Sequence, residues 1–149
     1  MTVATGEADL PPAGGFREVD HSGDVGLEVW GATLSELLAN ATRGLCGLMT
    51  WSVVRRASAR RVEVQAADAQ ELLVDWLSAL ILSASIHAEL YAGADVTVDE
   101  DGVAGGLLHG EALDPSRHEL RFDVKAATYH DILLEQTAAG YHARVVFDL

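Results

Sequence analysis

The sequence predicts an α+β fold in which a largely antiparallel sheet carries two amphipathic helices on one face. Two segments repeat apolar residues at helical spacing, and several others alternate apolar and polar residues as strands do. The chain has 149 residues, of which 49% are apolar, and this suits one domain with a buried core. Residues 1–15 contain two of the three prolines and little periodicity. We therefore expect a disordered leader at 1–15 and a single domain at 16–149.

Both expected helices begin with a capping box, in which the side chains of a first residue and of a Glu three positions later bond free N–H groups of the first turn. Thr33 and Glu36 form the first box, and Asp68 and Glu71 form the second. Apolar residues recur behind each box three and four positions apart, so each helix has a face that must pack on a sheet. These apolar residues are Leu34, Leu37, Leu38, Ala41, Leu45, Leu48 and Met49 in the first helix and Leu72, Leu73, Trp76, Leu77, Leu80 and Ile81 in the second.

The other periodic segments are expected to be strands. Val25, Leu27 and Val29 alternate on one face of the first, and the run Asp-Glu-Asp-Gly at 99–102 is a good turn between two others. The element order is then strand, helix, strand, helix and five further strands. The expected strands are 25–31, 61–66, 95–99, 103–113, 120–126, 132–136 and 141–149.

The charge of the chain restricts its partners. Ten Lys and Arg stand against 23 Asp and Glu, giving a net charge of −13. Such a surface repels phosphate backbones, so direct nucleic-acid binding is not expected. It favours divalent cations, a basic protein partner, or solubility alone.

Further sequence features concern location and the core. Cys46 is the only cysteine, which excludes an intrachain disulfide or a Cys-based zinc site, and we expect a thiol in or near the core. The start lacks the features of a signal peptide, and no stretch reaches the length of about 18 apolar residues that a membrane span needs. We therefore expect a soluble cytoplasmic protein with no membrane contact. The three tryptophans lie on or beside apolar stripes and are expected in the core, whereas His118 and His142 are expected at the surface or its boundary.

A first candidate site is the loop His-Ser-Gly-Asp-Val-Gly at 21–26. His21 and Asp24 are three residues apart with a glycine between them, in a tight loop that enters a strand. The Asp24 carboxylate is a ligand suited to a hard cation, and nearby carbonyls can add to it. The alternative is an ordinary turn in which Asp24 bonds its own backbone.

A second candidate site is the last strand, which ends abruptly at Asp148 and Leu149. The α-carboxylate of Leu149 then lies beside the Asp148 side chain. Two fixed negative charges repel each other unless a cation or an arginine lies between them. The alternative to a bound cation is compensation by Arg144, two pleats back.

A third candidate site is the run Lys-Ala-Ala-Thr-Tyr-His-Asp at 125–131. Lys125, the only lysine, offers a point charge for a phosphate or a carboxylate, and His130 can move a proton. The alternative is a polar strand crossing with ordinary surface charges.

Taken together and in this order, these motifs resemble the archease family. The resemblance covers nearly the whole chain from about Phe16 to Leu149. It is carried by residues 21–27 (His-Ser-Gly-Asp-Val-Gly-Leu), 37–41 (Leu-Leu-Ala-Asn-Ala), 71–77 (Glu-Leu-Leu-Val-Asp-Trp-Leu), 110–111 (Gly-Glu), 124–130 (Val-Lys-Ala-Ala-Thr-Tyr-His) and 143–149 (Ala-Arg-Val-Val-Phe-Asp-Leu).

The resemblance implies an accessory protein, itself no enzyme, that promotes guanylylation and multiple turnover of an RtcB-type RNA ligase in tRNA splicing or RNA repair. It implies a divalent cation, calcium or manganese, held by Asp24, Asp148 and the terminal carboxylate of Leu149. It also implies a strand-helix-strand-strand module elaborated by a further helix and strands. His21, Lys125 and His130 are then candidates for contact with the partner or its nucleotide.

Two other functions remain open from the residues alone. One is a small metal-dependent phosphoesterase in which His21, Asp24, His130 and Asp148 serve as ligands and base. The other is a general chaperone-like module that binds proteins and whose acidity only provides solubility.

Overall fold

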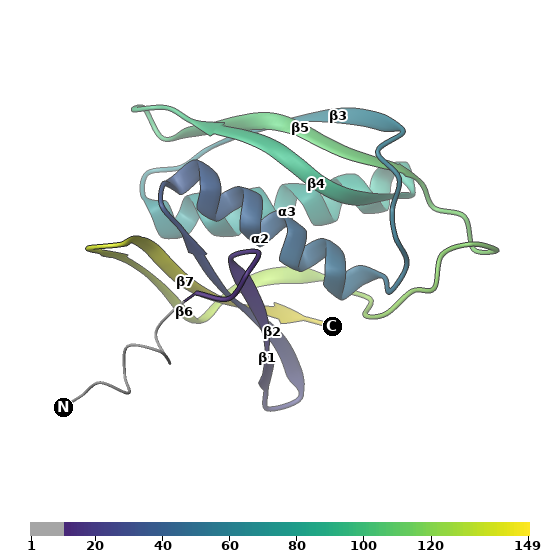
Figure 1. Cartoon of the computed structure of the whole chain (residues 1–149), viewed down its shortest axis with the longest axis horizontal. Helices are drawn as coiled ribbons and strands as arrows, with labels where there is room; N and C mark the ends of the chain where they lie inside the picture. The colour runs from purple at the N-terminus through teal and green to yellow at the C-terminus, as the bar shows by residue number, and fades with distance from the viewer. Residues whose placement is uncertain (1–10) are drawn as a thin grey trace.

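The computed structural model describes residues 11–149, apart from the side chain of His21, as two antiparallel sheets with two helices between them (Figure 1). The predicted leader at 1–15 therefore lies largely outside the described residues. The elements are β1 (Phe16–His21), β2 (Asp24–Gly31), α2 (Leu34–Met49), β3 (Ser58–Gln65), α3 (Ala69–His87), β4 (Glu89–Val98), β5 (Val103–Ala112), β6 (Ala126–Thr137) and β7 (Gly140–Asp148).

The strands divide between two sheets. One has the strand order β1-β2-β7-β6 and the other β3-β5-β4. This confirms the α+β class, the two helices and the antiparallel pairing. It corrects the expectation of a single sheet with both helices on one face, because α2 and α3 contact strands of both sheets. The expected strand-helix-strand-strand module is the run β3-α3-β4-β5, whose strands make up the three-stranded sheet.

Each helix begins at the residue that its capping box predicts. The Glu36 N–H donates to Thr33 Oγ1 at 3.1 Å, and the Glu71 N–H donates to an Asp68 side-chain oxygen at 2.9 Å. The Glu36 carboxylate in turn accepts from the N–H of Ala32, at 3.2 Å. These bonds satisfy N–H groups that have no partner within a helix.

The predicted apolar stripes form the core between the sheets. Trp76 is fully buried, and its indole N–H donates to Thr42 Oγ1 at 2.8 Å, which satisfies the polar group of a buried tryptophan. Cys46 is also buried, and desolvation raises the pKa of its thiol to about 12, as expected of an unreactive core thiol. The expectation for tryptophan is wrong at Trp51, which is 63% exposed.

α3 has the length and composition of a membrane span, with a mean hydropathy of 1.3 over its most apolar stretch. The expectation that no stretch of the chain is long and apolar enough to resemble a membrane span is therefore wrong at α3. The core helix of a soluble domain gives the same signal, and α3 packs between two sheets with Leu73, Trp76, Leu77 and Leu80 fully buried.

The segment 120–126, expected to be a strand, is mostly loop. Its only bridge joins Leu120 to Thr50, and β6 begins at Ala126. Its N–H groups instead complete the end of α2, because Arg121 N–H donates to the Met49 carbonyl and Phe122 N–H to the Leu48 carbonyl, both at 3.0 Å. The alternating apolar residues thus reflect a loop packed against a helix end.

A strand that the periodicity did not predict, β1, forms the edge of the four-stranded sheet next to β2. The structured part also starts before the expected boundary at residue 16. Gly15 N–H donates to the Pro12 carbonyl, and the Gly14 carbonyl accepts from the Arg43 guanidinium. Part of the expected leader therefore packs on the domain.

Candidate metal and partner site

The β1–β2 hairpin places Asp24 at one end of the four-stranded sheet. His21 pairs with Asp24 across a two-residue turn of Ser22 (φ 32°) and Gly23 (φ 92°). Positive φ at both central residues suits the right-handed twist of a hairpin, and Gly23 adopts it without strain. The backbone of His21 therefore lies beside Asp24, while its side chain is outside what the structure describes.

The register of β2 against β7 brings the second acid to the same place. Val25 pairs with Phe147 and Leu27 with Val145, so extending the ladder by one residue sets Asp24 opposite Asp148. Val25 and Phe147 point into the core, and side chains alternate along a strand, so both carboxylates lie on the outer face. Directly opposed residues have Cβ atoms about 5 Å apart. Two residues 124 positions apart in the sequence are thus cross-strand neighbours.

β6 holds the end of β7 from the other side. Ala126 pairs with Asp148, and the Lys125 N–H donates to the Asp148 carbonyl at 2.9 Å. Asp148 is therefore fixed between Asp24 and Lys125, and Leu149, 39% exposed, follows directly. The exposed Lys125 side chain starts from the same point.

No ion pair neutralises this acid pair in the described part of the chain. The compensation by Arg144 considered from the sequence is not seen, because Arg144 lies opposite Glu28 and no ion pair joins it to Asp148 among residues 11–149. The same residues contain no group of three or more His, Cys, Asp or Glu side chains able to hold a metal ion. The predicted ligand set differs from such a group, because it has two side chains and a chain terminus.

A wide bulge in β6 adds His130 near this end of the sheet. Thr128 pairs with Val146 and Leu133 with Arg144, so four residues of β6 face a single residue of β7. The Thr128 hydroxyl donates to the Val146 carbonyl at 2.9 Å and accepts from the His130 N–H at 3.3 Å. His130 is exposed, and its Nε2 lies 3.5 Å from an Asp131 oxygen.

Tyr129 lies in the bulge and is 54% exposed, and the sequence alone did not single it out. Burial raises the pKa of its hydroxyl, and the negative charges of Asp75, Glu71 and Asp68 on α3 and at its N-cap raise it further. Asp131, in the same bulge, has a positive φ of 52°. A register shift of this kind does not show in the pattern of side chains along the sequence.

A groove of about 670 Å³ begins where Lys125 leaves the sheet. It lies between the second half of α3 and the loop before β6. Leu82 and Phe122 line it and are 59% and 37% exposed. Lys125 therefore borders both the acid pair and an open apolar groove.

The site thus contains most of what the sequence predicted, in one place. Asp24, Asp148, Leu149 and Lys125 meet at the end of the four-stranded sheet, with the His21 backbone in the hairpin and His130 on the adjoining bulge. Oxygen ligands on neighbouring strands can bind a hard cation such as Ca²⁺. An adjacent lysine can hold a phosphate or a carboxylate of a partner.

Comparison with known proteins extends over the whole domain. Residues 16–149 match a family model described as "Archease protein family". A protein named "Protein archease" from Methanothermobacter thermautotrophicus is 34% identical over 139 residues, 91% of this chain and 99% of its own. One of the same name from Methanopyrus kandleri is 31% identical over 138 residues, with 90% and 99% covered.

Two solved structures share the fold. A solution structure of a Methanobacterium thermoautotrophicum protein superposes with a TM-score of 0.76 at 32% identity, covering 91% of this chain and 99% of its own. A crystal structure from Thermotoga maritima, whose title calls it an archease and possible chaperone, has a TM-score of 0.62 at 17% identity, with 89% and 96% covered. At 17% identity the second likeness concerns the fold alone.

Proposed function

This chain belongs to the archease family, and from that membership we propose that it is an accessory protein of an RtcB-type RNA ligase. It promotes guanylylation of the ligase and its repeated turnover in tRNA splicing or RNA repair. It does so through a divalent cation, calcium or manganese, bound by Asp24, Asp148 and the α-carboxylate of Leu149. The description of a relative as a possible chaperone is consistent with a protein that acts on other proteins rather than as an enzyme.

The observation that carries this proposal is the register of β2 against β7, whose last pair, Val25 and Phe147, sets the adjoining Asp24 and Asp148 opposite each other on the outer face of the sheet. Opposed like charges destabilise a sheet unless something offsets their repulsion, and a divalent cation does so. Two side-chain carboxylates and one terminus occupy only part of the shell of six to eight oxygens that Ca²⁺ takes. Water, nucleotide phosphate or ligase oxygens can fill the rest.

This chain's own residues then have distinct roles. Asp24 and Asp148 hold the cation where a partner's nucleotide can reach it, and a cation beside a triphosphate neutralises charge that develops during nucleotidyl transfer. Lys125, fixed by its N–H bond to Asp148, offers its ammonium to a phosphate or a ligase carboxylate. His21, at the end of β1, and His130, on the bulge of β6, border the site and contact the partner there.

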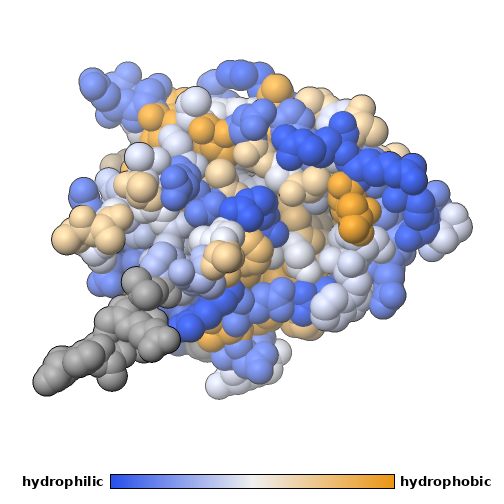
Figure 2. Space-filling model, in the orientation of Figure 1, coloured by the Kyte–Doolittle hydropathy of each residue, from blue (hydrophilic) through white to orange (hydrophobic). Residues whose placement is uncertain are grey.

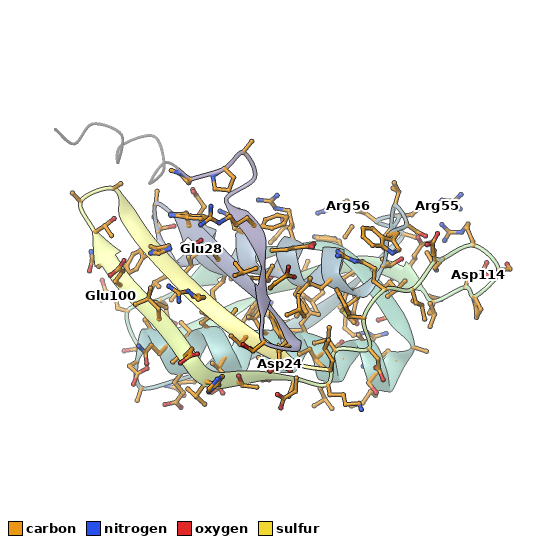
Figure 3. The ribbon with its side chains drawn as sticks, turned by 90° about the horizontal axis from the view of Figure 1, so that it is seen from below. Asp24, Glu28, Arg55, Arg56, Glu100 and Asp114 are labelled. Atoms are coloured by element: carbon orange, nitrogen blue, oxygen red, sulfur yellow. The ribbon has the colours of Figure 1, made fainter. Side chains whose placement is uncertain are left out.

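The experiment follows ligase–GMP formation by the cognate ligase with GTP and manganese, with this protein present at a sub-stoichiometric ratio. Asp24→Asn is expected to lower the acceleration about tenfold or more, because a ligand is lost. Glu100→Gln removes the same charge from the β4–β5 turn of the other sheet and is expected to leave it intact (Figure 3). A glycine added after Leu149 displaces the terminal carboxylate and is expected to act like Asp24→Asn.

Two outcomes would count against the proposal. Normal stimulation by Asp24→Asn would remove the cation from the mechanism, and absence of stimulation by the unaltered protein would remove the ligase. Hydrolysis of a generic phosphodiester by the protein alone with manganese would support a phosphoesterase instead.

The apolar groove favours a second candidate, a chaperone-like module. Leu82 and Phe122 expose apolar surface there, which suits unfolded clients. Suppression of the aggregation of several unrelated proteins, lost in Leu82→Ser, would support this function. Suppression confined to the ligase would support the accessory role.

A further inference from the structure

The segment that joins α2 to β3 forms an exposed surface that the proposed function does not use. We name it the α2–β3 surface and define it by Trp51, Val53, Arg55 and Arg56. Trp51 is 63% and Val53 86% exposed, and both arginines are exposed. Figure 2 shows a strongly hydrophilic band with a hydrophobic spot on the right of this face, where the segment crosses in Figure 1.

The main chain of this segment is held at several points. Trp51 N–H donates to the Glu119 carbonyl at 3.0 Å, and the Ser52 hydroxyl accepts from the Glu119 N–H at 2.7 Å. Further along, Arg55 N–H donates to a Glu111 carboxylate oxygen at 2.7 Å, and Ala57 N–H to the Gly110 carbonyl at 3.0 Å. The exposed side chains therefore project from a fixed backbone, which lowers the entropy lost on binding.

A buried polar cluster supports the segment from below. Glu111, 8% exposed, also accepts from the Arg117 guanidinium and from His118 Nε2, at 3.1 Å for the histidine. His118 Nδ1 accepts from the Asp114 N–H, so the ring proton is on Nε2. The His118 side chain is fully buried, which corrects the expectation of a surface residue. Burying charged groups costs desolvation free energy, which is offset when their geometry is good and their hydrogen bonds are satisfied.

The charges of the α2–β3 surface are uncompensated although the chain is acidic. Among residues 11–149, Arg55 and Arg56 form no ion pair with a carboxylate, whereas five other arginines do. The Arg56 guanidinium and the stem of Arg43 both lie against Gly93. The neighbouring Asp114 carboxylate is engaged by Ser116 at 2.7 and 3.0 Å. Positive charge thus accumulates at one end of a protein of net charge −13.

We propose that the α2–β3 surface binds a short acidic segment of a partner protein. Carboxylates of that segment pair with Arg55 and Arg56, and an apolar side chain packs on Trp51 and Val53. Tryptophan and arginine dominate the binding energy of many protein interfaces, and opposite charge favours encounter. This surface is separate from the acid pair, since Figure 3 shows Arg55 and Arg56 at the opposite side from Asp24.

A short peptide fits this surface better than RNA. Charges are screened beyond about 8 Å at physiological ionic strength, so a compact acidic segment interacts mainly with the nearby arginines. A longer polyphosphate extends past them onto a surface where acids outnumber bases, and each phosphate there is repelled. The exposed Val53 also offers an apolar contact that a phosphate backbone does not use.

The test measures fluorescence anisotropy of a labelled peptide, Glu-Asp-Leu-Glu-Asp-Phe-Glu-Asp, with the full chain. We expect weak binding, with Kd on the order of 100 µM, that weakens further as NaCl rises from about 0.05 to about 0.5 M. Arg56→Glu is expected to raise Kd about tenfold, whereas Arg61→Glu makes the same charge change on β3 and leaves Kd nearly unchanged. Glu119→Gln, which removes an exposed acid from the neighbouring loop, is expected to lower Kd.

Trp51→Ala separates apolar packing from charge. It is expected to raise Kd for this peptide several-fold but not for one in which Ser replaces Leu and Phe. Equal Kd values for Arg56→Glu and Arg61→Glu, with unchanged Tm, would overturn the proposal. Tighter binding of a twelve-nucleotide oligouridylate would assign the surface to RNA instead. Dimers in sedimentation that Arg56→Glu abolishes would assign it to a second copy of this chain.

Discussion

The carboxylate of Glu111 and the pair Asp24 and Asp148 are treated in opposite ways by the same fold. Glu111 is buried and receives hydrogen bonds from the Arg55 N–H, Arg117 and His118, and the first of these contributes most to lowering its pKa to about 2. Asp24 and Asp148 oppose each other at a sheet end and form no ion pair among the described residues. A carboxylate with its partners built in fixes the structure, and a carboxylate pair without them is suited to an external cation.

The largest effect on stability should come from Glu111→Gln. The change removes the charge that pairs with Arg117 and His118, and it leaves the half-exposed guanidinium and the buried imidazole with a weaker acceptor. We expect Tm to fall by roughly 10 °C in thermal unfolding, whereas Glu100→Gln on the exposed turn leaves it nearly unchanged.

The pH dependence of stability tests whether the charge of the Glu111 carboxylate is the cause of this effect. The pKa of Glu111 is about 2 in the folded chain and near 4.5, the ordinary value for a glutamate, when the chain is unfolded. Its contribution is therefore present above about pH 4.5 and is lost as pH falls toward 2. The free energy of unfolding of the wild type should fall more steeply across that window than that of Glu111→Gln. Parallel curves of unfolding free energy against pH would show that the ionised Glu111 carboxylate does not stabilise the fold.

The second effect should appear when calcium is added. A cation that binds only the folded state at a concentration of 100 times its Kd stabilises by about 2.7 kcal/mol. We expect a rise in the unfolding free energy of the wild type that is absent in Asp24→Asn and in Asp148→Asn, measured by urea denaturation with calcium or with EDTA. An equal rise in all three proteins would place the cation elsewhere.

The smallest effect should be seen in EDTA. Without a cation, Asp24→Asn removes one of two opposed negative charges and is expected to stabilise the fold by about 0.5 kcal/mol. Asp101→Asn, in the β4–β5 turn, is the matched control and should show no gain. Destabilisation by Asp24→Asn would mean that Asp24 mainly bonds its own turn, which is the alternative that the sequence left open.

The sequence predicts elements well where the signal is local. Capping by Thr33 and Asp68 placed both helices at their observed starts, and alternation identified β2, β5 and β7. The alternation of apolar and polar residues did not identify β1, because this edge strand bears Arg17, Glu18 and Asp20 and has no fully buried face. The division into two sheets also escaped prediction, since strand pairing depends on distant partners.

The candidate site was predicted for a different reason. No local pattern relates Asp24 to Asp148, and only the family resemblance joined them before the register of β2 and β7 did. The α2–β3 surface was not predicted at all. Trp51 follows an apolar helix and was expected in the core, and its exposure results from main-chain bonds to Glu119, 68 positions away in the sequence.

The end of α2 has a consequence for how the chain folds. Its last carbonyls accept from Arg121 and Phe122, more than 70 residues later, so the helix is completed only after the whole of the three-stranded sheet has been synthesised. Contacts between such distant residues raise the contact order and slow folding, because a long loop must close before they form. The end of α2 therefore stays without these partners during much of synthesis, and such incompletely packed segments are prone to aggregation.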